Sequence, residues 1–181
     1  EFNRLLSSVI SVYGEPKLEK TKVQETYKEQ DKTIDKKNYQ LITNEKEIDQ
    51  WIYEAEENGE LAIDTETSSL NAHETDLVGI SLSTKVGKAC YIPIGHKFKG
   101  CLKKEAVIKK LKPLLEDESV KKIGQNIKFD FIVLFKQGIN MNSMEDTMLM
   151  SYVLDAGKNR HNMDTLSEIH LQHKTISFKE I

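Results

Sequence analysis

The segment Glu60-Leu61-Ala62-Ile63-Asp64-Thr65-Glu66 is a short apolar run that ends in two acids separated by one threonine. We predict a buried strand, in which successive side chains point to opposite faces, so that Asp64 and Glu66 share one face. Two carboxylates held that close repel each other and raise each other's pKa unless a cation lies between them. In phosphoryl-transfer sites that cation is usually Mg²⁺ or Mn²⁺. An edge strand that ends in solvated acids is the alternative interpretation, because Asp-x-Glu by itself is common.

Composition limits the classes of protein that this chain fits. Its 181 residues, 38% of them hydrophobic, suit one globular domain with some flanking chain. The formal net charge of −3 provides no general basic field, so a nucleic acid would have to be held locally. Neither a membrane-spanning run nor a secretory start is visible, and Cys90 and Cys101 lack metal-ligand or redox-pair spacing. We therefore expect a cytoplasmic protein with no membrane partner.

The chain divides near Asn38. Residues 1–14 could form a short amphipathic helix, and residues 15–37 mix seven Lys with six Asp or Glu and few apolar side chains, as a linker does. Residues 38–181 are predicted to form the domain proper. The start at Glu1 rather than Met suggests a piece of a longer chain.

Inside the domain, hydrophobic spacing predicts strands and helices in a definite order. Strands are expected at 39–42, 60–66, 77–83, 89–94 and 120–123, and helices at 44–58, 103–115, 126–138, 146–154 and 163–171. Thr43 or Asn44 should cap the first of these helices, Gly59 should end it, and Pro113 should disturb the last turn of the next. Three successive strands followed by alternating strands and helices predict an α/β fold, a mixed sheet flanked by helices.

A second group of polar residues lies where a strand ends at Gly124 and a helix begins, in the segment Gly124-Gln125-Asn126-Ile127-Lys128-Phe129-Asp130. Asn126 and Asp130 are four residues apart, so we expect them on one helix face near its N-terminal end. Free backbone N–H groups at that end attract phosphate. The alternative is a capping Asn with an incidental, exposed Asp.

These two motifs resemble the first two exonuclease motifs of the 3′-5′ proofreading domain in bacterial family A DNA polymerases, the DNA polymerase I type. The first is Asp64-Thr65-Glu66-Thr67 with Leu70, and the second is the segment from Gly124 to Asp130. The resemblance continues in order through residues 89–96, 113–117, 146–149 and 160–178. It covers about residues 38–181 and would make residues 1–37 the end of a preceding 5′-nuclease region with a linker.

The resemblance implies a ribonuclease H-like fold that hydrolyses the 3′-terminal phosphodiester of single-stranded or frayed DNA, with a polymerase domain C-terminal in the parent chain. It implies that Asp64, Glu66 and Asp130 are the catalytic acids and hold two divalent metal ions, for which Mg²⁺, Mn²⁺ and Zn²⁺ are candidates. Two alternatives stay open. One is a degenerate exonuclease fold kept as a scaffold or DNA-binding module, and the other is a stand-alone RNA-processing exonuclease.

The resemblance also assigns substrate contacts. Gln125, Asn126, Phe129 and Arg160 would hold the terminal nucleotides, and Leu70 and Phe178 would pack against the terminal base. Apolar and aromatic contacts suit single-stranded DNA because they grip any base, and an Arg can fork onto a phosphate. From composition alone, Leu70 and Phe178 would be core residues and Arg160 a loop charge.

One motif of the family does not occur in residues 1–181. It is a Tyr followed four residues later by an Asp, which would position the attacking water and add a fourth acid. The fold is therefore expected to be truncated before this third motif, and the chain alone to be weakly active or inactive. Tyr152 and Asp155 are three residues apart and fall where the family has an ordinary helix, so we interpret them as structural.

Overall fold

The computed structural model describes residues 3–14 and 38–176. The chain separates into two units, one ending at Thr33 and the other beginning at Ile34. The first contains the expected helix, α1 (Asn3–Tyr13). The expected linker at 15–37 and the side chain of Phe178 lie outside the described residues.

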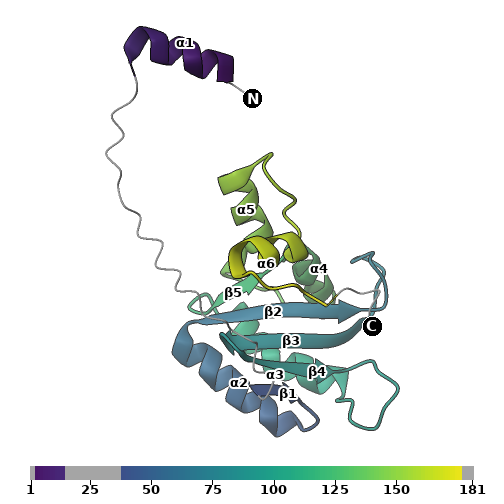
Figure 1. Cartoon of the computed structure of the whole chain (residues 1–181). Coiled ribbons are helices and arrows are strands. Elements are labelled where there is room, and N and C mark those ends of the chain that lie inside the picture. The colour runs from purple at the N-terminus through teal and green to yellow at the C-terminus, as the bar shows by residue number, and fades with distance from the viewer. Residues whose placement is uncertain (1–2, 15–37, 177–181) are drawn as a thin grey trace. The chain divides into compact units, whose positions relative to one another are not determined.

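The second unit contains every other element (Figure 1). In chain order these are β1 (Tyr39–Leu41), α2 (Glu45–Asn58), β2 (Glu60–Thr67), β3 (Leu77–Lys85), β4 (Lys88–Pro93), α3 (Lys104–Glu116), β5 (Lys121–Gly124), α4 (Lys128–Lys136), β6 (Met144–Asp146), α5 (Thr147–Asp155) and α6 (Met163–Leu171).

The strands form one sheet in the order β1-β4-β3-β2-β5-β6. The hairpin of β3 and β4 and the pairing of β2 with β3 are antiparallel, whereas β1, β5 and β6 add in parallel to β4, β2 and β5. The predicted mixed sheet is therefore confirmed. Because β2 lies between β3 and β5, the alternative of an edge strand ending in solvated acids is wrong.

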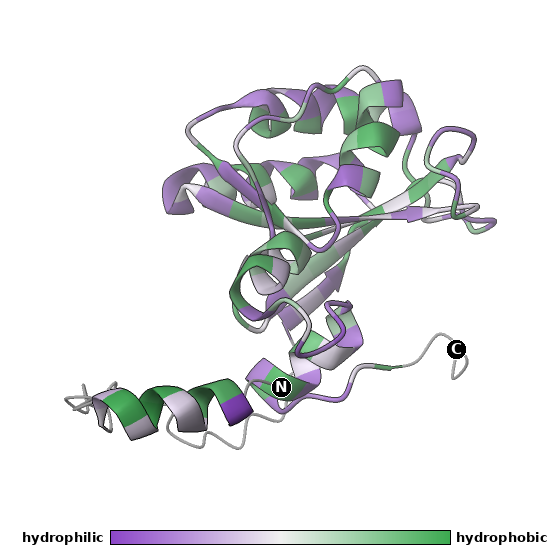
Figure 2. Cartoon of the chain, turned by 90° about the horizontal axis from the view of Figure 1, so that it is seen from above, coloured by the Kyte–Doolittle hydropathy of each residue, from purple (hydrophilic) through white to green (hydrophobic). Residues whose placement is uncertain are grey.

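Helix α2 packs against α3, β2 and β3. Its buried residues Ile48, Trp51 and Ala55 join the core with Leu61 and Ile63 of β2. Figure 2 shows hydrophobic and hydrophilic residues alternating along the strands and striping the helices, as expected of elements that bury one face. None of the helices in the described ranges is long and apolar enough to cross a bilayer.

The ends of α2 form as the sequence predicts. The Asn44 side chain accepts from the Lys46 amide, and Glu47 reaches back to the Asn44 amide, which together make a capping box. Gly59 follows the helix with φ 67°, a left-handed conformation that glycine adopts without steric cost. This tight stop lets the chain enter β2 directly.

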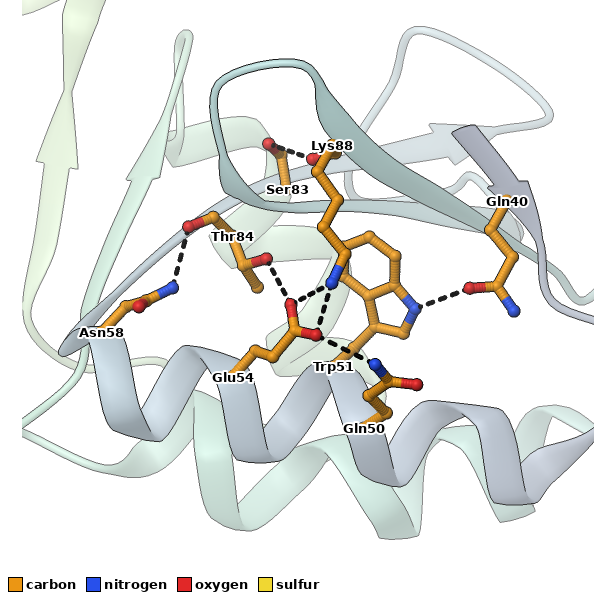
Figure 3. Close-up of polar contacts among 8 residues, drawn as sticks. All are labelled: Gln40, Gln50, Trp51, Glu54, Asn58, Ser83, Thr84 and Lys88. Carbon is orange, nitrogen blue, oxygen red and sulfur yellow. Dashed lines mark hydrogen bonds and ion pairs between the residues drawn. The ribbon is translucent and has the colours of Figure 1, made fainter. Parts of the chain in front are cut away.

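A polar network fastens α2 to the β3–β4 hairpin (Figure 3). Lys88 forms an ion pair with Glu54 and lies 4.9 Å from the centre of the Trp51 ring. The Thr84 hydroxyl donates to Glu54 at 3.0 Å, and the Asn58 amide donates to the Thr84 carbonyl at 2.9 Å. These contacts fix the helix against the hairpin at the side of the sheet where β2 and β4 begin. The last residues of both strands lie at the opposite side.

Three expectations for the helices need correction. Helix α3 continues through Pro113 to Glu116, because the buried Leu114 and Leu115 hold the last turn although one backbone donor is missing. The apolar spacing of a helix from Asn126 predicts that Phe135 faces inward together with Phe131 and Leu134, but Phe135 is 59% exposed. Strand β6 was not predicted.

Candidate active site

The two acids of β2 lie on the more open face of the sheet. Leu61, Ile63 and Thr65 are buried on one side, and Asp64 and Glu66 alternate with them on the other, as predicted. Their partners across β3 are small: Asp64 pairs with Ser81, and Glu66 pairs with Gly79. The Tyr91 ring lies over Gly79, where a Cβ atom would lie 1.9 Å from the Tyr91 hydroxyl oxygen, so a larger residue than glycine would not fit there.

Asp130 reaches β2 from α4. The pairing of β2 with β5 ends at Ala62 and Ile123, and beyond that point the Thr65 amide donates to Asp130 Oδ1 at 2.8 Å. The Thr65 hydroxyl donates to the same oxygen at 2.6 Å. Asp130 is only 2% exposed, so the alternative of an incidental, exposed Asp is wrong. Thr65 thus positions Asp130 beside the strand that carries the other two acids.

The electrostatics of the three carboxylates agree with this proximity. Burial, followed by the charges of Asp130 and Glu66, raises the pKa of Asp64 to about 6. Burial also raises the pKa of Asp130, against the two hydrogen bonds from Thr65, which lower it. Negative charge is therefore disfavoured here unless a cation shares the site.

The donor set suits a divalent metal ion in its chemistry. Carboxylate oxygens are the ligands that Mg²⁺ and Mn²⁺ prefer, and three of them carry enough charge to hold such ions. Among the described residues, however, no group of three or more His, Cys, Asp or Glu side chains stands close enough to share one ion. Asp64, Glu66 and Asp130 would be the residues that hold such an ion, and the charges of Asp130 and Glu66 both act on Asp64.

The turn before α4 differs from the prediction. Asn126 has φ 58°, so it is left-handed and precedes the helix rather than sharing a helix face with Asp130. Asp146 holds this turn, because its carboxylate accepts from the amides of Asn126 at 3.0 Å and Ile127 at 3.1 Å. The same carboxylate caps α5 by accepting from the Met148 amide at 2.9 Å.

Gln125 is tied to two segments that are distant in sequence. Its amide nitrogen donates to the His161 carbonyl at 2.8 Å, and its amide oxygen accepts from the Thr147 hydroxyl at 2.5 Å. The residue before His161 is Arg160, which is exposed. The structure thus places the chain around Arg160 next to the Gln125 turn, although no hydrogen bond of Arg160 itself is seen within the described residues.

The apolar residues expected to contact the substrate differ in exposure. Leu70 is 95% exposed in the loop after β2, so it is not a core residue. Phe129 is partly buried and packs against the core, next to Asp130 in α4. Phe178 lies outside the described residues. The roles of these residues, and of Gln125, Asn126 and Arg160, stay predictions.

Tyr152 and Asp155 are engaged within the α5–α6 region. Asp155 pairs with Lys158 at 2.5 Å, and Tyr152 packs edge-on against His161 with ring centroids 5.3 Å apart. These contacts support the structural interpretation of both residues.

Two positioning residues, Thr65 and Asp146, were not predicted from the sequence. Thr65 is the middle residue of Asp-Thr-Glu, and strand alternation predicts that its side chain points to the buried face. The hydrogen bond that it makes there to Asp130 of α4 could not be predicted from that pattern. Asp146 directly precedes α5, as helix-capping acids do, yet its bonds to the Gln125–Ile127 turn depend on the sheet order.

A mixed sheet that brings together acids from its interior strand and from the helix after the neighbouring strand defines the class, a ribonuclease H-like nuclease fold. The Aedes aegypti Nibbler EXO domain shares this fold at 12% identity, with a TM-score of 0.64 over 83% of this chain and 76% of that chain. A structure of Brucella melitensis NrnC with bound Mg²⁺ is similar at 27% identity, with a TM-score of 0.54 over 66% of this chain and 56% of that chain.

Residues 39–181 match the 3′-5′ exonuclease family, and the chain belongs to it. DNA polymerase I of Rhizobium leguminosarum is 41% identical over 169 residues, which cover 82% of this chain. DNA polymerase I of Pseudomonas aeruginosa is 40% identical over 150 residues, which cover 80%. The chain spans 16% of the length of each of these two relatives.

Proposed function

We propose that this chain is the exonuclease part of a DNA polymerase I and removes nucleotides from the 3′ end of single-stranded or frayed DNA. The observation that carries the proposal is the set of three carboxylates, in which burial and then the charges of Asp130 and Glu66 raise the pKa of Asp64. A cluster of like charges costs stability, and a site for divalent ions is the usual reason for such a cluster. The relatives named DNA polymerase I support DNA as the substrate.

In this proposal Asp64, Glu66 and Asp130 hold two divalent ions, Mg²⁺ or Mn²⁺. When bound, such ions supply an activated water and neutralise charge on the phosphate. The chain's own contribution is to fix the acids: β2 sets the spacing of Asp64 and Glu66, and Thr65 fixes Asp130. Gln125, Asn126, Phe129 and Arg160 then hold the terminal nucleotides, and Leu70 and Phe178 pack against the terminal base.

A degradation assay on a 5′-labelled single strand tests the proposal. In Mg²⁺ or Mn²⁺ the parent DNA polymerase I chain should produce a ladder that shortens from the 3′ end, and Asp64→Asn in that chain should lower the rate by at least about 10²-fold. Asp155→Asn is the matched control, because it removes the same charge at an acid paired with Lys158. Equal loss of activity in both variants, or activity that persists in Asp64→Asn, would contradict the proposal.

The same assay separates the alternatives. Binding of the strand by wild type without any shortening, at every divalent ion tried, would favour a scaffold or binding module. Faster shortening of a ribonucleotide strand of the same sequence would favour RNA as the substrate. Blunt duplex DNA should be shortened more slowly than a strand with frayed 3′ ends, because the terminal base must be free to be gripped.

A further inference from the structure

The loop after β4, residues 94–103, begins beside the candidate active site. Strands β2 and β4 both pair antiparallel with β3, so they run in the same direction. Glu66 pairs with Gly79, and Gly79 pairs with Pro93, the last residue of β4. In Figure 1 the loop accordingly leaves the sheet at the end to which the β2 and β4 arrows point. The loop is thus adjacent to the strand end that carries the acids.

This loop carries positive charge in an acidic protein. Residues 77–104 contain no Asp or Glu, whereas the whole chain has a formal charge of −3. His96, Lys97 and Lys99 are all exposed. Neither Lys97 nor Lys99 forms an ion pair with any residue that the structure describes. The charges of these two lysines are therefore exposed to solvent next to the carboxylates of the candidate site.

Tyr91 connects the loop to the face that carries the acids. Its hydroxyl and His96 Nε2 are 2.5 Å apart in a hydrogen bond. The ring covers Gly79, where a Cβ atom would lie 1.9 Å from the Tyr91 hydroxyl oxygen. The pKa of Tyr91 is raised by burial and by the charge of Glu66. Because Gly79 pairs with Glu66 of β2, the hydrogen bond to Tyr91 holds His96 near the end of that strand.

The base of the loop is fixed by hydrogen bonds. The Gly95 amide donates to the Val78 carbonyl at 2.9 Å, and the Leu102 amide donates to the Pro93 carbonyl at 2.9 Å. The Phe98 ring lies over Gly100, yet remains 45% exposed. A fixed base with an exposed aromatic ring between two lysines combines the two features of single-strand binding surfaces, a stacking platform and cations for the backbone.

We propose that His96, Lys97 and Lys99 bind backbone phosphates of the single strand whose 3′ end occupies the acid site, and that Phe98 offers a stacking surface beside them. The inference rests on the proposed function and adds a second contact site for the same substrate. The acids repel phosphate, so cations at the adjoining loop offset that repulsion and guide the strand toward Glu66. Lys contacts of this kind carry no base preference.

The test measures binding of a labelled oligothymidylate to the full chain by fluorescence anisotropy, in Ca²⁺ and over a series of KCl concentrations. Lys97→Gln/Lys99→Gln should weaken binding by about 3- to 10-fold at low salt. The slope of log affinity against log salt concentration should also become less steep by about 1.4, because each phosphate contact on a single strand contributes about 0.7 to that slope. At saturating strand the degradation rate should match wild type while KM rises.

Lys85→Gln/Lys109→Gln is the matched control, because it makes the same charge change at exposed lysines on the β3–β4 turn and on α3. Loss of affinity in the loop variant alone supports the inference. If wild type and the loop variant have equal affinity and equal salt slope, the inference is overturned while the proposed function stays intact. If the loop variant and the control variant lose affinity equally, the loss is a general charge effect, and the inference is again overturned. A wild-type chain that neither binds nor degrades the strand overturns the inference and the proposed function together.

Discussion

At the scale of single residues, the carboxyl group of Asp64 opposes folding when it is charged. Its pKa in the folded chain is about 6, whereas the ordinary value is 3.8. The folded state therefore binds the proton more tightly than the unfolded state. The resulting stabilisation is fully present below pH 3.8 and is lost as the pH rises through about 6.

We predict that Asp64→Asn stabilises the metal-free chain at pH 7 by about 1–2 kcal/mol, after discounting for solvent screening. The gain should vanish near pH 4, where the wild-type carboxyl is itself protonated. Urea unfolding in EDTA at both pH values measures it. Asp155→Asn should give no gain at pH 7, because the pKa of Asp155 is lowered by Lys158. A loss of stability in Asp64→Asn would mean that its charge is structurally required.

The sequence identified the acids but not the details that orient them. Asp64, Glu66 and Asp130 were recognisable from two short motifs, and strand alternation placed the first two on one face. The left-handed Asn126 was not foreseeable, because a helical conformation from Asn126 onward has similar local propensity. Its correct geometry depends on Asp146, which lies 20 residues away and reaches the turn only through the order of β5 and β6.

At the scale of elements, Asp146 joins the start of α4 to the start of α5. The carboxylate is 8% exposed and accepts from amides in both segments. We predict that Asp146→Ala costs about 2–3 kcal/mol, because it leaves several buried amides without an acceptor. Asp146→Asn should lose less, since it keeps one oxygen. Amide hydrogen exchange should accelerate at Asn126, Ile127 and Met148 before it does in β2, and unchanged exchange there would contradict the role.

The ion pair of Lys88 and Glu54 fastens α2 to the hairpin, and it makes that junction depend on pH. The hydrogen bond from Lys88 is the largest cause that lowers the pKa of Glu54. The depressed pKa means that the ion pair stabilises the fold above the ordinary pKa of 4.5 and that this stabilisation is lost as the pH falls.

We predict that Lys88→Met destabilises the chain by about 1 kcal/mol at pH 7 and by less at pH 3. Thermal melting of the two proteins at both pH values measures this difference. Lys85→Met, at an exposed position of the same hairpin, is the control and should change little. A difference between wild type and Lys88→Met that is the same at both pH values would point to the contact with the Trp51 ring rather than to Glu54.

Element boundaries in the sequence were clearest where local chemistry marks them. Of the predicted caps Thr43 and Asn44, Asn44 begins α2, Gly59 ends it as predicted, and α6 has its predicted bounds. Strand β6 has only three residues, and its pairing with β5 comes from tertiary structure, so no pattern of alternation could reveal it. Helix α4 begins two residues later than expected, and the exposed Phe135 stacks against Phe131 with ring centroids 5.8 Å apart.

At the scale of the whole molecule, the buried hydrophobic residues of the described ranges all lie between Ile42 and Met141. Helix α1 buries none of its side chains. The free energy that holds the sheet and its helices together therefore comes from the second unit, which begins at Ile34. The order of the strands, which brings Asp130 to Thr65, likewise involves that unit alone.

We predict that a chain beginning at Ile34 unfolds within about 1 °C of the full chain and keeps the same cooperativity, because every buried hydrophobic residue of the described ranges is kept. Differential scanning calorimetry of the two chains measures this. A drop of about 2–4 °C, which corresponds to about 1 kcal/mol for a domain near this size, would show that residues 1–33 contribute to the stability of the sheet. Deletion of residues 1–41 is the positive control. It removes β1, which pairs with β4 through Tyr39, Gln40 and Leu41, so it should lower the melting temperature even if the first deletion does not.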